Sequence, residues 1–113
     1  MELPTITDED MRARLARART YTLMVLRKTA KYERPAHDAI VTEHGRRNMA
    51  LVEAGLLNVV CPVGNDPELA GIGIFDADLD RVRAIYDEDP GVQAGIFQVD
   101  LYTCRGFPGA TLA

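Results

Sequence analysis

The sequence predicts an α+β domain, a ferredoxin-like sandwich with the order βαββαβ, preceded by one extra helix. Two long segments repeat apolar residues at helical spacing, at about residues 36–54 and between Asp78 and Pro90. Four short segments carry the continuous or alternating apolar pattern of β-strands: residues 21–26, 57–61, 69–75 and 95–104. The length of 113 residues is that of one domain.

A short amphipathic helix is predicted for residues 8–19, ahead of the first strand. Thr7 is a capping residue, and the acids that follow it favour the first turn of a helix. Met11 and Leu15 fall on one face, with arginines around them. A solvated face explains these arginines more simply than an anionic ligand or a partner chain does. We therefore divide the chain into a helical extension, a ferredoxin-fold domain and a tail, at residues 1–19, 20–107 and 108–113.

The first strand is largely apolar on both of its faces. Tyr21, Leu23 and Val25 point to one side, and the residues between them point to the other. Both helices of a βαββαβ unit lie on one face of its sheet, so the other face would stay exposed in a single chain. We expect a second copy to cover it, sheet against sheet, in a homodimer.

The helix of residues 36–54 carries an apolar stripe that should face the sheet. Pro35 fits its first position, and Gly55 is a natural stop. The stripe consists of residues at spacings of four, four and three: Ile40, His44, Asn48 and Leu51.

In the second half of the chain, glycines mark the third strand and aspartates mark the start of the second core helix. Gly71 and Gly73 lie on one face of the third strand and leave room for a close approach. The second core helix begins at a capping residue, Asp76 or Asp78, and ends before Pro90. Its apolar face consists of Leu79, Val82, Ile85 and Tyr86.

The composition argues against several classes of function. A net charge of −4 disfavours nucleic acid as a partner. No apolar run approaches the roughly 18 residues of a membrane span, and the acidic N-terminus lacks the order of a signal peptide. Two cysteines, Cys61 and Cys104, are too few for a disulfide framework, so a reducing cytoplasm is the simplest location.

His44 and Asp89 are the predicted catalytic pair, although each has a structural alternative. A lone histidine on a core-facing stripe is more often structural than functional. Asp89 ends a run of three acids where the helix dipole disfavours negative charge, and Pro90 favours a conformation that turns its side chain away. The alternative for Asp89 is a solvated helix end. The domain is small enough for the two side chains to meet.

A carboxylate that holds one imidazole nitrogen fixes its tautomer, and the other nitrogen can then exchange a proton with a substrate. Such a pair suits proton abstraction beside a carbonyl, isomerisation or elimination. It does not suit amide hydrolysis here, since the chain has no serine. We expect no metal, because no Cys/His cluster has zinc spacing. We expect no cofactor, because Gly71-Ile72-Gly73 lacks the setting of a dinucleotide fingerprint.

Further candidates would bind the substrate. Three basic residues after the first strand are suited to a substrate carboxylate: Lys28, Lys31 and Arg34. Cys61 would be a nucleophile only if it lay near His44 and partly exposed, and a small buried apolar role is the alternative. Tyr102 belongs to a predicted polar patch that either lines a wet cavity between subunits or bonds across their interface. The other members of that patch are Asn58, Gln98 and Asp100.

Three parts of the sequence carry a family resemblance: His44, the segment Glu53-Ala54-Gly55-Leu56-Leu57, and the segment Asp89-Pro90-Gly91-Val92-Gln93-Ala94-Gly95. On these, residues 21–107 resemble the YCII-related family of the dimeric α+β barrel superfamily. The resemblance implies a homodimer with His44 and Asp89 paired in a pocket. It also implies small-molecule lyase or isomerase chemistry, including dehydrochlorination of ring-derived acids. Cys61 departs from the usual glycine before proline, and Gly91 departs from the usual aromatic residue.

The sequence therefore predicts a cytoplasmic homodimer that transfers protons on a small molecule, with His44 as general acid/base and Asp89 orienting it. Two alternatives stay open. A non-catalytic binding or accessory module would use the pair only as a structural hydrogen bond. A cofactor-free oxygenase of the same superfamily would act on a phenolic substrate.

Overall fold

Four antiparallel strands form one sheet in the computed structural model, which describes residues 1–113. Their order across the sheet is β2-β3-β1-β4. The strands are β1 (Arg19–Lys28), β2 (Leu57–Pro62), β3 (Leu69–Phe75) and β4 (Phe97–Gly106). The helices are α1 (Asp8–Ala16), α2 (Asp38–Glu53), α3 (Leu79–Asp87) and α4 (Pro90–Gln93). The predicted α+β class, the ferredoxin-like order and the extra N-terminal helix are confirmed.

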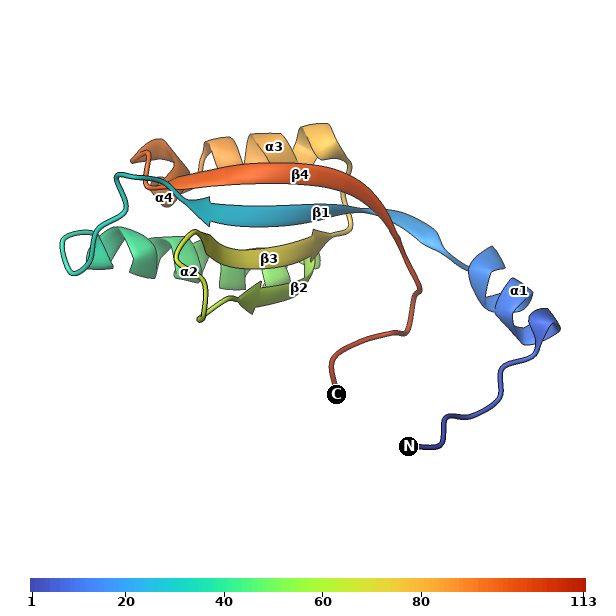
Figure 1. Cartoon of the computed structure of the whole chain (residues 1–113). Coiled ribbons are helices and arrows are strands. Elements are labelled where there is room, and N and C mark those ends of the chain that lie inside the picture. Colours follow the sequence, from blue (N-terminus) through green and yellow to red (C-terminus); the bar gives the residue numbers. More distant parts are fainter.

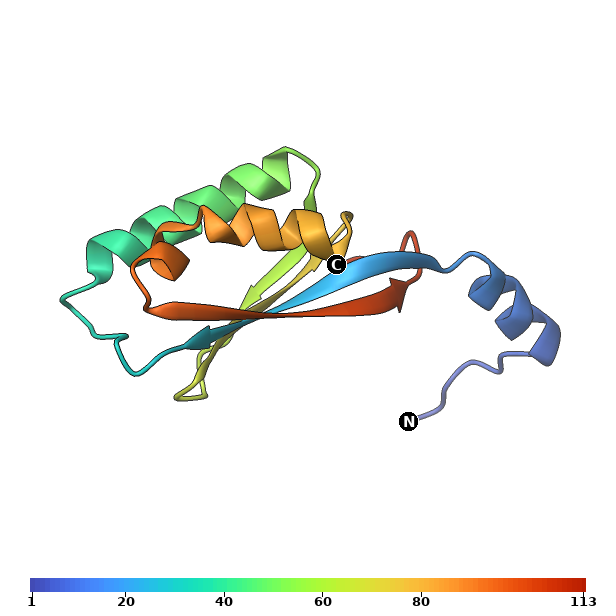
Figure 2. The same ribbon diagram turned by 90° about the horizontal axis from the view of Figure 1, so that it is seen from above.

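The helices α2 and α3 cover one face of the sheet, and the other face has no helix over it (Figures 1 and 2). The strand register places Met24 opposite Gly73 and Leu26 opposite Gly71 on the covered face. Burial of apolar side chains on this face is the main favourable term for the fold. The buried core consists of Met24, Leu26, Leu57, Phe75, Val82, Tyr86, Ile96, Phe97 and Val99.

The uncovered face of the sheet is apolar at its centre. Leu23 and Val25 of β1 lie opposite Ile74 and Ile72 of β3. All four side chains are only partly buried. The alternation predicted for the first strand is therefore present, with one face covered by helices and the other left open within this chain.

Helix α1 projects from the start of β1, away from the sheet (Figure 1). The hydroxyl of Thr7 accepts a hydrogen bond from the Asp10 amide at 3.1 Å, which confirms the predicted cap. The helix ends at Ala16, earlier than the predicted residue 19, because Arg19 already pairs with Gly106 in the sheet. No residue of α1 is buried.

The start of α2 differs from the prediction. Pro35 is not its first residue, because a turn precedes the helix and is closed by two hydrogen bonds between Glu33 and His37. The His37 amide donates to the Glu33 carbonyl at 3.0 Å, and the Glu33 amide donates to His37 Nδ1 at 3.1 Å. The helix therefore begins at Asp38. The predicted end of α2 at Gly55 is confirmed. Gly55 follows the C-cap residue Ala54 with a φ of +78°, a conformation that favours glycine.

Asp78, rather than Asp76, is the N-cap of α3, and its carboxylate accepts from the Arg81 amide at 2.9 Å. After α3 the chain forms α4, a one-turn helix that the sequence pattern does not predict. Asp89 links the two helices in an extended conformation, as its position before Pro90 predicts.

No helix combines the length and the apolar character that a bilayer crossing requires.

Candidate active site

Asp89 is fixed by the backbone of α4. It is the N-cap of that helix, and its Oδ2 accepts hydrogen bonds from the amides of Gly91 at 2.9 Å and Val92 at 3.2 Å. Its side chain is fully buried. Pro90 at the first helical position has no N–H to satisfy, so the next two amides are free to hold the carboxylate. A buried acid in this setting is an acceptor with a fixed orientation.

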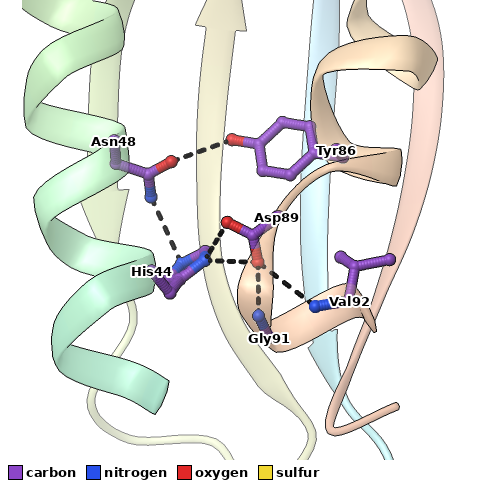
Figure 3. Close-up of polar contacts among 6 residues, drawn as sticks. All are labelled: His44, Asn48, Tyr86, Asp89, Gly91 and Val92. Carbon is purple, nitrogen blue, oxygen red and sulfur yellow. Dashed lines mark hydrogen bonds and ion pairs between the residues drawn. The ribbon is translucent and has the colours of Figure 1, made fainter. Parts of the chain in front are cut away.

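His44 reaches Asp89 from α2, on the other side of the site (Figure 3). Its Nδ1 lies 2.9 Å from Asp89 Oδ1 and 3.0 Å from Oδ2. His44 is 7% exposed, and its imidazole packs against the ring of Phe97, with the ring centres 4.8 Å apart. Because the carboxylate accepts, Nδ1 carries a hydrogen, and Nε2 is the ring nitrogen that can accept one.

Asn48 and Tyr86 extend the pair into a network. Asn48 Nδ2 lies 3.2 Å from His44 Nε2, and the Tyr86 hydroxyl donates to Asn48 Oδ1 at 3.2 Å. Burial raises the pKa of Tyr86 well above its usual range, so its hydroxyl keeps its hydrogen and donates it. The sequence places Asn48 on the stripe of His44, one turn further along, but gives it no role. It presents Tyr86 only as an apolar residue.

A pocket of about 340 Å³ lies beside this network, between α2 and the covered face of the sheet. Its volume is in the range of small-ligand sites. Most of its lining is hydrophobic, and the residues of α2 that line it are Val41, His44, Gly45, Asn48 and Met49. Lys28 at the end of β1 contributes its cation, held 5.2 Å from the ring centre of Tyr32. Gly71 meets the prediction of a close approach, because a Cβ there would lie 3.1 Å from the carbonyl oxygen of Cys61.

Two of the predicted carboxylate-binding residues lie outside this lining. Arg34 is exposed and forms an ion pair with Asp38, and its Nη1 donates to the Tyr32 hydroxyl at 3.3 Å. Lys31 is exposed in the same loop, with its side chain near Gly95. Lys28 is the basic residue that the structure brings to the pocket.

Cys61 and Tyr102 lie on the opposite edge strands of the sheet, β2 and β4, and both belong to its uncovered face. Cys61 belongs to the pocket lining, but it pairs with Ile72, which directs its side chain to the uncovered face. Tyr102 is 51% exposed and pairs with Leu23 on that same face, away from His44.

The predicted polar patch is corrected in one respect. Asn58 lies on β2, at the edge of the sheet opposite β4, so it cannot join the β4 side chains. Gln98, Asp100 and Tyr102 alternate along β4, and the Gln98 amide donates to Asp100 Oδ1 at 3.4 Å. The chain gathers no group of three acids, cysteines or histidines that could hold a metal ion.

A family model described as the YCII-related domain matches residues 20–103, more than half of the 113-residue chain. No curated protein matches the sequence. The matched range contains all four side chains of the network, and α1 lies outside it.

Proposed function

The chain belongs to the YCII-related domain family, and from this premise we propose that it is a small-molecule enzyme that transfers a proton without a cofactor. The observation that carries the proposal is the buried contact of His44 Nδ1 with both carboxylate oxygens of Asp89, at the wall of a pocket. An oriented imidazole beside a ligand-sized pocket is what general acid–base catalysis requires. The reaction is of the lyase or isomerase type.

His44 acts through Nε2, because Asp89 holds the other nitrogen. Nε2 takes a proton from a carbon next to a carbonyl group, and the electrons of the broken C–H bond move into the carbonyl to give an enolate. The carboxylate of Asp89 stabilises the imidazolium that forms. In an isomerisation, His44 returns the proton to another carbon. In an elimination, the enolate expels a leaving group, which takes the proton.

The pocket supports a small substrate with an apolar body and an anionic group. Its walls are mostly hydrophobic, and Lys28 is the cation among them. An ammonium group in a partly apolar site attracts a carboxylate. We therefore assign to Lys28 the role that the sequence offered equally to Lys31 and Arg34, which lie outside the lining.

The active form in this proposal is a cytoplasmic homodimer. Two partly buried free thiols, Cys61 and Cys104, support a reducing compartment. The uncovered apolar face of the sheet supports association with a second copy. In this arrangement residues 20–107 form the functional domain, with residues 1–19 as an extension and 108–113 as a tail.

Exchange of hydrogen for deuterium tests the proposal, because it reports proton abstraction directly. Small 2-oxo acids, 2-oxobutanoate among them, would be incubated with the protein in D₂O and followed by proton NMR. His44→Gln keeps a donor for the buried Asp89, and Asp89→Asn keeps the cap of α4, so both should fold. We expect each to lower the exchange rate by about 10²–10⁴-fold, the usual contribution of a general base.

His37→Gln is the matched control, because His37 lies in the turn before α2 and does not line the pocket. It should exchange at the wild-type rate. Wild-type rates in both His44→Gln and Asp89→Asn would refute the proposed mechanism.

A small-ligand-binding module is the second candidate, and one observation favours it. His44 Nε2 already has a hydrogen-bond partner in Asn48, at 3.2 Å. A network in which each buried polar atom has a partner is also what a purely structural role would produce. In that case wild-type protein would bind 2-oxo acids without exchanging their hydrogen. The only effect of His44→Gln would be a lower free energy of unfolding.

A further inference from the structure

The side-chain hydrogen bonds of the buried network all donate in one direction, from Tyr86 through Asn48 and His44 to Asp89, the N-cap of α4 (Figure 3). The amide oxygen of Asn48 can only accept, so the Tyr86 hydroxyl donates to it at 3.2 Å. The amide nitrogen Nδ2 faces His44 Nε2, which can accept because the ring hydrogen lies on Nδ1, and the Tyr86 hydroxyl then holds the amide oxygen in place. His44 in turn donates from Nδ1 to Asp89. Each group has one role that its neighbour dictates.

Asn48 has one donor hydrogen more than the network uses. Its Nδ2 carries two hydrogens, and His44 Nε2 is its hydrogen-bond partner in the protein. Asn48 and His44 both belong to the lining of the pocket. A ligand in the pocket therefore meets the second amide hydrogen of Asn48 directly beside the imidazole nitrogen Nε2.

We propose that Asn48 is a catalytic residue that binds the carbonyl oxygen of the substrate, and that Tyr86 is the positioning residue that orients its amide. The proposal rests on the proposed function and names the group that receives the developing charge. The carbonyl oxygen and the hydrogen on the neighbouring carbon are separated by three bonds. One small molecule can thus present the first to Asn48 Nδ2 and the second to His44 Nε2.

The proton and electron balance follows from this placement. His44 Nε2 forms a bond to the hydrogen as the C–H bond breaks, and the electron pair becomes the enolate with its negative charge on oxygen. Asn48 donates to that oxygen more strongly as the charge grows, so it stabilises the transition state more than the ground state. Entry of the substrate also replaces Asn48 as the partner of Nε2.

Kinetics of 2-oxobutanoate exchange in D₂O test the proposal. Removal of one donor to a developing oxyanion lowers kcat by about 10²–10³-fold, and we expect this from Asn48→Ala with a small change in KM. Tyr86→Phe keeps the ring packed but frees the amide to turn, so kcat should fall by a smaller factor. Asn65→Ala, in an exposed loop, and Tyr21→Phe, on the uncovered face, are the matched controls and should retain wild-type rates.

A second readout does not depend on turnover. Oxalate is a planar dianion that resembles an enolate of a 2-oxo acid, and it would be titrated into ¹⁵N-labelled protein. We expect the side-chain amide signal of Asn48 to shift in the wild type, and the shift to weaken in Tyr86→Phe.

The outcomes separate this inference from the proposed function. Exchange that depends on His44 but is unchanged in Asn48→Ala would overturn the inference alone. An oxalate-induced shift of the Asn48 signal without any exchange would support Asn48 as an oxygen ligand and overturn proton transfer. Neither exchange nor shift would overturn both.

Discussion

The carboxylate of Asp89 receives hydrogen bonds from two directions, His44 on one side and the amides of Gly91 and Val92 on the other. Asparagine caps helices as well as aspartate does, so Asp89→Asn should keep its oxygen towards α4. Its NH₂ group then faces His44 Nδ1, where two donors cannot share one hydrogen bond. We expect the neutral imidazole to move its hydrogen from Nδ1 to Nε2, which the ¹⁵N shifts of labelled histidine report.

The tautomer change has a consequence one residue further along the network. A hydrogen on His44 Nε2 would oppose the Nδ2 donor of Asn48, so the Asn48 amide should turn over and present its oxygen. The chain has two histidines, and His37→Gln assigns their signals. A ring that keeps its hydrogen on Nδ1 in Asp89→Asn would contradict this view of the network.

Two glycines beside the site have opposite surroundings. A Cβ at Gly45, in the middle of α2, would meet nothing within 4 Å, whereas a Cβ at Gly91 would clash with the ring of Phe97. Gly45→Ala should raise the free energy of unfolding by about 0.5–1 kcal/mol, the cost of glycine in a helix interior. Gly91→Ala should lower it by about 1–3 kcal/mol through overpacking. Urea unfolding of both variants measures these two changes in the free energy of unfolding.

Gly45 lines the pocket, so its missing side chain also keeps space open beside His44. Gly45→Ala should therefore be more stable and bind ligands in the pocket more weakly. A destabilised Gly45→Ala, or a Gly91→Ala as stable as wild type, would contradict the packing described around these two positions.

The sequence predicts some secondary-structure elements more completely than others. The bounds of β3 follow from its apolar run, and they agree at both ends. β1 extends beyond its apolar run at both ends, from Arg19 to Lys28, because pairing with β4 continues past the apolar residues. Backbone pairing does not need apolar side chains, so the apolar pattern is shorter than the strand. The continuation after Leu26 is what carries Lys28 into the pocket.

Helix α4 illustrates what apolar periodicity cannot detect. Four residues make too short a pattern, and the local signal is a capping Asp89 followed by Pro90. The role of Tyr86 in the network cannot be predicted for a different reason. Its spacing marks it as a core residue, which it is, but the partner of its hydroxyl depends on how α2 and α3 pack together. The meeting of His44 and Asp89, by contrast, follows from two helices that share one face of a small sheet.

The uncovered face of the whole molecule carries an ion pair that makes stability depend on pH. Arg27 Nε donates to Asp100 Oδ2 at 2.7 Å, and this hydrogen bond holds the pKa of Asp100 below its usual range. A carboxyl group with a lowered folded-state pKa stabilises the fold above its unfolded pKa of about 3.9, and this contribution is lost as pH falls further. We expect stability to fall less steeply below pH ~4 in Asp100→Asn than in wild type. Equal slopes in urea unfolding at several pH values would contradict the assignment.

Association through the uncovered face is the property that belongs to the molecule as a whole. Leu23 lies on β1, with Ile74 on one side and Tyr102 on the other, and no helix of its own chain covers it. A lysine there would have to give up water to pack against apolar side chains. We expect wild-type protein to sediment as a dimer and Leu23→Lys as a folded monomer, because the core on the helical face is untouched. Val52→Lys, on the exposed side of α2, is the matched control and should remain dimeric. A wild-type monomer, or a dimer that survives Leu23→Lys, would show that this face is not the interface.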